Sequence, residues 1–107
     1  MGFFVYQLQS DVNQAQSVEK RRSNRFVIRT QANQVISFEH YQNKDSQMIR
    51  RRVNGSGHQP MLLEVASFQV SESKEAYDLA VVFINKEAYH TCIPKNKVNQ
   101  DTSLLTP

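Results

Sequence analysis

Apolar residues near the start of the chain recur at the spacing of one helix face. Phe4, Leu8, Val12 and Ala15 are separated by steps of four, four and three, and polar residues fill most of the positions between them. An α-helix repeats every 3.6 residues, so these four side chains fall on one side of it. The pattern predicts an amphipathic helix over residues 3–18, and the polar stretch 19–24 predicts a surface connection after it.

The rest of the chain alternates between apolar and polar residues, as half-buried strands do. This pattern predicts strands over residues 26–30, 35–41, 48–53, 61–70, 77–84 and 88–93. Both faces of 77–84 are apolar, which is typical of a central strand. The links are of hairpin length, which favours antiparallel neighbours. The predicted fold class is therefore α+β, with an N-terminal helix packed on an antiparallel sheet of about six strands, in a single domain of residues 1–107.

One turn has a clear signature. Asn54-Gly55-Ser56-Gly57 follows an arginine-rich strand, and two glycines with an asparagine supply positive φ angles at little cost. Pro60 has no N–H to donate, so it suits the first position of the next strand. Ser67 is a candidate interruption within the predicted strand 61–70.

The charge of the chain is mild but uneven. The 107 residues include 13 Lys and Arg against 10 Asp and Glu, a net charge of +3. Two basic clusters stand out, Lys20, Arg21, Arg22 and Arg25 in one and Arg50, Arg51 and Arg52 in the other. Together they can grip phosphates without reading sequence, so a small DNA-binding module is one interpretation. In the plainer interpretation the arginine stems cover apolar area on the sheet, and the charges prevent an edge strand from pairing with another molecule. The modest net charge favours this second interpretation.

The candidate chemistry is sparse. His40, His58 and His90 lie at no metal-ligand spacing, and Cys92, the single cysteine, excludes an internal disulfide. His90 lies two residues from Cys92 on the same strand face, so a contact between them is possible. A cysteine in such a position is more commonly a small apolar residue in or near the core than a nucleophile. The acidic residues are scattered, and no phosphate-binding loop occurs. The sequence predicts no catalytic residue, no metal and no cofactor, and hence a non-enzymatic protein.

The two ends of the chain carry expectations of their own. The apolar run Phe3-Phe4-Val5-Tyr6 has no polar cap before it. We expect residues 1–2 to be additions to the natural chain and a longer hydrophobic segment to precede Phe3 there. The surface of Phe3, Phe4, Val5 and Leu8 is then a candidate interface with partner subunits. At the other end, the polar composition predicts a flexible tail over 94–107.

The order of these segments resembles a known family. An apolar helix with the polar continuation YQLQSDVNQAQSV is followed by NRFVIRT, VISFEHY and MIRRRVNGSGHQPMLLEVASFQV. This order is similar to ComGF, a minor pseudopilin of the competence apparatus of Gram-positive bacteria, and more distantly to the J-type minor pseudopilins of type II secretion. The resemblance runs from about Phe3 to Ile84. It is strongest from Ile49 to His58 and in Leu62-Leu63 and Val65-x-Ser67-Phe68.

The resemblance implies a non-enzymatic structural subunit on the outer face of the cell membrane. Such a subunit is anchored by a hydrophobic N-terminal helix and joins other minor pseudopilins in a short pilus that supports DNA uptake during transformation. Direct DNA binding by this subunit is not implied. The DNA-binding module remains an alternative function, and a phage or envelope adaptor of the same fold is a further one.

Overall fold

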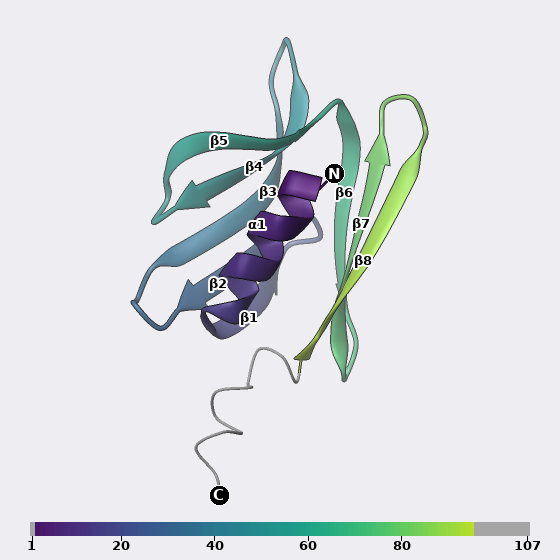
Figure 1. Cartoon of the computed structure of the whole chain (residues 1–107). Coiled ribbons are helices and arrows are strands. Elements are labelled where there is room, and N and C mark those ends of the chain that lie inside the picture. Colours follow the sequence, from purple (N-terminus) through teal and green to yellow (C-terminus); the bar gives the residue numbers. More distant parts are fainter. Residues whose placement is uncertain (1, 96–107) are drawn as a thin grey trace, which may run out of the picture.

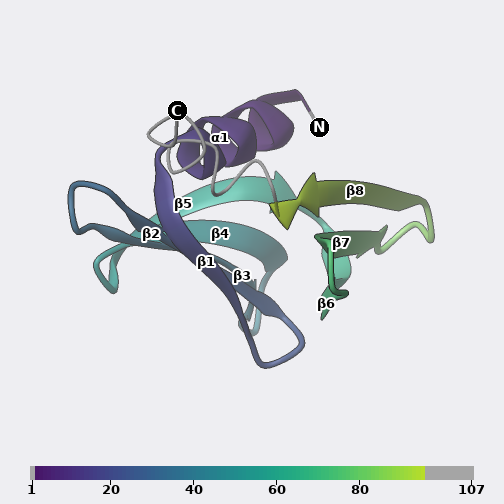
Figure 2. The same cartoon turned by 90° about the horizontal axis from the view of Figure 1, so that it is seen from below.

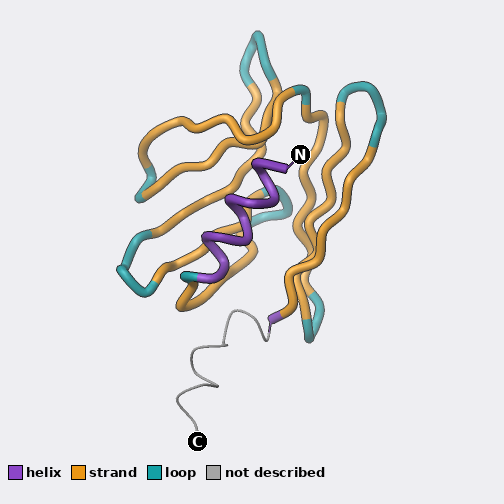
Figure 3. The backbone as a smooth tube through the Cα atoms, in the orientation of Figure 1, coloured by secondary structure: helices purple, strands orange, loops and turns teal. Residues whose placement is uncertain are grey.

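The computed structural model describes residues 2–95, which form one helix followed by eight strands (Figure 1). The helix α1 spans Gly2–Asn13. The strands are β1 (Ala15–Arg21), β2 (Arg25–Thr30), β3 (Val35–Gln42), β4 (Gln47–Val53), β5 (Ser56–Leu63), β6 (Val65–Glu72), β7 (Ala76–Phe83) and β8 (Ala88–Pro94). Only short loops join them (Figure 3).

The strands form two antiparallel sheets. One has five strands in the order β1-β2-β3-β4-β5, and the other has three in the order β6-β7-β8. The predicted α+β class is confirmed, whereas a single sheet of about six strands is wrong. As predicted, β7 is a central strand.

Both α1 and the three-stranded sheet pack on the same face of the five-stranded sheet, here called its inner face (Figure 2). Phe26 and Phe38 are paired across β2 and β3, so their side chains share that face. Phe38 meets Phe4 of α1, with ring centroids 5.9 Å apart, and Phe26 meets Tyr77 of β7 at 5.5 Å. The helix and both sheets therefore share one hydrophobic core.

The opposite, outer face of the five-stranded sheet carries no helix or strand of residues 2–95 (Figure 2). Val27 and Met48 lie on this face and are buried, yet they do not belong to the shared core. Arg25 and Arg29 lie two residues on either side of Val27 on the same face, and Arg50 lies two residues from Met48. The stems of arginines can cover apolar surface while their heads stay in water.

The helix is shorter than predicted. It ends at Asn13, and residues predicted to be its last turn belong to β1, which pairs with β2 from Ala15 to Arg21. Ala15 is buried, as the helical spacing required, but it reaches the core from a strand. Pairing with β2 also replaces the predicted surface connection at 19–24, leaving only the short turn 22–24.

The predicted strand 61–70 is in fact two strands. The chain bends at Glu64, which has a φ of 58°, and passes there from the edge of the first sheet into the second. A positive φ is uncommon for glutamate, so this break could not be predicted from the residue type. The expected interruption at Ser67 corresponds to a shift in the β6–β7 register between Val65 and Ser67.

The predicted glycine turn is present. Asn54, Gly55 and Gly57 have φ angles of 54°, 74° and 85°, and the hairpin closes with Val53 opposite Ser56. Pro60 lies inside β5 rather than at its start. An edge strand tolerates this, because one side of it donates to no neighbour.

The expected flexible tail began at Pro94. In the structure Pro94 ends β8, and the side chain of Lys95 contacts Glu72, with Nζ 2.6 Å from Oε2. The remainder of that tail, residues 96–107, lies outside the described residues.

Because Phe4 is fully buried and its neighbour Phe3 is 57% exposed, the two aromatics test the packing of α1. We expect Phe4→Ala to lower the free energy of unfolding by about 3–5 kcal/mol. Phe3→Ala should change it by less than about 0.5 kcal/mol. Urea denaturation followed by circular dichroism measures both, and equal effects would contradict this packing.

Candidate functional site

Two carboxylates are buried within residues 2–95. Asp11 on α1 is 4% exposed and Glu39 on β3 is 5% exposed. A buried charge without a counter-ion is destabilising, so the stability of the fold depends on the partners of these two side chains. Both acquire their main partners from the arginine triplet of β4.

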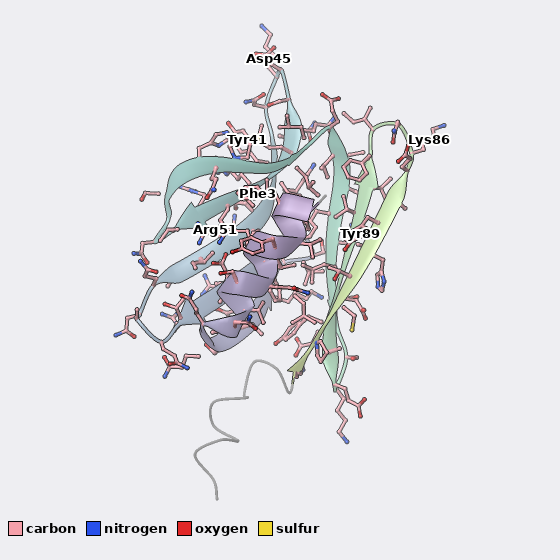
Figure 4. All side chains as sticks on the ribbon, viewed as in Figure 1. Phe3, Tyr41, Asp45, Arg51, Lys86 and Tyr89 are labelled. Atoms are coloured by element: carbon pink, nitrogen blue, oxygen red, sulfur yellow. The ribbon has the colours of Figure 1, made fainter. Side chains whose placement is uncertain are left out.

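Arg51 faces inward and holds Asp11. Its Nε donates to Oδ2 of Asp11 at 2.8 Å and its Nη2 donates to Oδ1 at 3.0 Å, a two-pronged contact between guanidinium and carboxylate. Gln7 adds a hydrogen bond to Oδ1, and Gln59 accepts one from Nη1 of Arg51. Figure 4 shows Arg51 beside the helix. This pair fastens α1 to the five-stranded sheet.

Arg50 and Arg52 face outward and surround Glu39. Nε of Arg50 donates to Oε1 of Glu39 at 3.0 Å, and Nη1 of Arg52 lies 3.8 Å from the same oxygen. Nη2 of Arg25, from the neighbouring strand β2, is 2.7 Å from Oε2. One carboxylate thus faces three guanidinium groups.

An aromatic pair adjoins this cluster. The guanidinium of Arg50 lies 4.0 Å from the ring centroid of Tyr41, and its Nη1 is 3.3 Å from Nδ1 of His58. The rings of Tyr41 and His58 meet edge to face with centroids 5.2 Å apart. Arg52 also donates to the backbone oxygen of Gly55 at the β4–β5 turn. These contacts fix the arginine heads on the outer face.

The structure divides the predicted basic residues among three places. Arg25, Arg50 and Arg52 meet at Glu39, whereas Arg51 points to the opposite face. Lys20, Arg21 and Arg22 are exposed at the β1–β2 turn, where Arg21 forms an ion pair with Glu19 at 3.1 Å. The two clusters therefore converge in part, through Arg25.

The predicted partner interface is also divided. Phe4 and Leu8 are 0% and 1% exposed, so in this fold they are core residues and not contact residues. Phe3 remains accessible, and Val5 is half-buried. Tyr6, which was not predicted, is 70% exposed and adds to the exposed side of α1.

A histidine, a carboxylate and a thiol do meet on the exposed face of the second sheet. Asp78 lies opposite Cys92 in the β7–β8 register, and its Oδ1 is 3.2 Å from Nε2 of His90. The carboxylate of Asp78 thus adjoins both the imidazole and the thiol. Partial desolvation raises the pKa of Cys92, and the charge and hydrogen bond of Asp78 raise it further. An activated cysteine needs the opposite shift, so this trio is unsuited to nucleophilic catalysis.

His40 of β3 has a structural contact. Nε2 of His40 donates to the backbone oxygen of Val65 at 2.8 Å and so links the two sheets. Within residues 2–95, no group of three or more His, Cys, Asp and Glu side chains could hold a metal ion.

A narrow crevice of about 70 Å³ lies between α1 and β8. Apolar side chains line part of it, including Val5, Leu8 and Ile93. The volume suits two or so water molecules at liquid density. Within residues 2–95, no helix combines the length and the apolar character that crossing a membrane requires.

The fold and these surfaces define a small α+β protein with exposed aromatic residues on its helix and an arginine-rich outer sheet face. The family model described as "Putative Competence protein ComGF" matches residues 1–89. The chain therefore belongs to the ComGF family of competence proteins, and the resemblance seen in its sequence is confirmed. No curated protein and no solved structure matches the chain.

The buried pair between Asp11 and Arg51 provides a stability test. We expect Arg51→Gln to lower the free energy of unfolding by about 3–5 kcal/mol, because it leaves a buried carboxylate without its counter-ion. Arg21→Gln, in an exposed pair, should change it by less than about 1 kcal/mol. A thermal melt of each variant checks this, and similar losses for both would count against the described role of Arg51.

The arrangement around Cys92 provides a chemical test. A raised pKa keeps the thiol protonated near pH 8, so we expect slow labelling by an aromatic disulfide reagent despite the exposure of Cys92. Asp78→Asn removes the negative charge, lowers the pKa and should speed labelling. His90→Gln should leave the rate almost unchanged. A marked slowing in the His90 variant would instead indicate a working thiol–imidazole pair.

Proposed function

We propose that this chain is a minor pseudopilin, a non-enzymatic structural subunit of a Gram-positive competence pilus that supports DNA uptake. The family match over residues 1–89 carries the proposal, since it places the chain among competence proteins. In this proposal the subunit lies at the outer face of the cell membrane. A hydrophobic segment ahead of Phe3 continues α1 into the membrane.

The shape of α1 supports an assembly role. Its inner side packs in the core, whereas Phe3 and Tyr6 remain exposed on the other side. Aromatic residues are enriched among the side chains that anchor protein interfaces. The helix can therefore pack on its own sheet and still offer a contact surface to a sibling subunit.

The test is co-purification of the 107-residue chain with the proteins encoded beside its gene. We expect at least one of these proteins to bind in a defined ratio. The double variant Phe3→Ser, Tyr6→Ser should weaken binding at least tenfold, because two exposed aromatic anchors are lost. Titration by surface plasmon resonance measures the loss.

Ile84→Ser is the matched control, because Ile84 is an exposed apolar residue that directly follows β7 and does not belong to α1. It should bind like the unmodified chain. Absence of any bound sibling, or equal losses in the control and the double variant, would refute an assembly role through α1.

A further inference from the structure

The outer face of the five-stranded sheet holds an excess of positive charge. The strand register places seven charged residues there, Arg21, Arg25, Arg29, Arg50, Arg52, Glu19 and Glu39. Elsewhere within residues 2–95 basic and acidic residues are equal in number, so this face carries the whole net charge of that part of the chain. Such a charge distribution marks one surface as the basic side of the molecule.

The arginines are spaced at regular intervals. Arg25 and Arg50 lie in one row across the sheet, Arg52 lies opposite Ser37 in the next row, and Arg29 lies opposite Val35 in a third. Successive rows are two residues apart, about 7 Å along a strand. The arginines therefore form a regular array that can contact several phosphates of one backbone.

Much of this charge is available to a ligand. Arg29 is exposed and forms no ion pair with any described residue. The side chains of Arg25 and Arg52 are 41% and 31% exposed, and they share the single carboxylate Glu39 with Arg50. The cluster at Glu39 is thus only partly neutralised. Its hydrogen bonds hold the guanidinium heads in fixed positions, which lowers the entropic cost of binding an anion.

The face lacks the features of a protein-docking or lipid-binding surface. Its apolar residues Val27 and Met48 are only 3% and 6% exposed, so they cannot serve as central anchors for a protein partner. Peripheral lipid binding depends on apolar side chains that insert between headgroups. Leu63, at the rim of the face, is the one large apolar residue there that is markedly exposed. Charged heads without an apolar centre suit a phosphate backbone.

We propose that this face binds the phosphate backbone of DNA without sequence preference, through Arg25, Arg29 and Arg52. Arg50 acts as a positioning residue, held between Glu39 and Tyr41. Arg51, committed to Asp11 on the other face, takes no part. This proposal goes beyond the assembly role and does not depend on it, because binding to purified DNA requires no sibling subunit.

The experiment is fluorescence anisotropy of a labelled 20-base-pair duplex titrated with the 107-residue chain at salt concentrations from 20 to 200 mM. With about three phosphate contacts, the slope of log K against log salt should be about −3. Arg29→Gln and Arg25→Gln should each reduce its magnitude by about one and weaken binding about tenfold at 50 mM salt. The effect should be the same for any duplex sequence.

Lys74→Gln is the matched control, because it removes one exposed positive charge at the β6–β7 turn, away from this face. It should leave both affinity and slope nearly unchanged. The proposal is overturned by the absence of binding at 20 mM salt, or by an equal loss in the Lys74 variant. It is also overturned if phosphatidylserine vesicles or polyglutamate bind through these arginines while the duplex does not.

Discussion

The fold depends on how three consecutive arginines neutralise two buried carboxylates on opposite faces of a sheet. Neighbouring residues of a strand point to opposite sides, so Arg51 reaches Asp11 of the helix while Arg50 and Arg52 reach Glu39 of β3. A shift of one residue in the register of β4 would exchange the two sides. Each carboxylate would then face the wrong part of the arginine run. The ion pairs therefore favour one register of β4 and one position of α1, even though a buried ion pair often adds little net stability compared with apolar side chains of similar size.

Most strands were predictable because their alternation is local. The hairpin between β4 and β5 was predictable as well, since Asn54 and Gly55 adopt positive φ angles readily. The end of α1 was not predictable. The polar residues after Asn13 have no strong preference for helix or strand, and their pairing with β2 decides their structure. The break at Glu64 was hidden for a different reason. A glutamate between two apolar runs does not indicate a left-handed backbone. Yet Glu64 separates the two sheets, whereas the alternation of residues predicted one continuous strand over 61–70.

The candidate site was predictable as a set of arginines but not as a set of contacts. Asp11 is 40 residues from Arg51, and Glu39 is 11 residues from Arg50. Counter-ions at such distances are identified only once the register of the sheet and the position of the helix are known.

The same reasoning applies to the start of the chain. Helical spacing put Phe4 and Leu8 on one face, but that face covers the chain's own sheet, and the accessible aromatics Phe3 and Tyr6 lie on the other side.

The two proposed contact surfaces lie on opposite sides of the five-stranded sheet, since α1 covers the inner face and the arginines occupy the outer one (Figure 2). A sibling subunit that packs on Phe3 and Tyr6 therefore leaves the arginines uncovered. In the proposed pilus, any neighbouring subunits that also carry a basic face would act on the same polyanion. A single face with about three phosphate contacts binds weakly at physiological salt, whereas a row of such faces binds with much higher avidity.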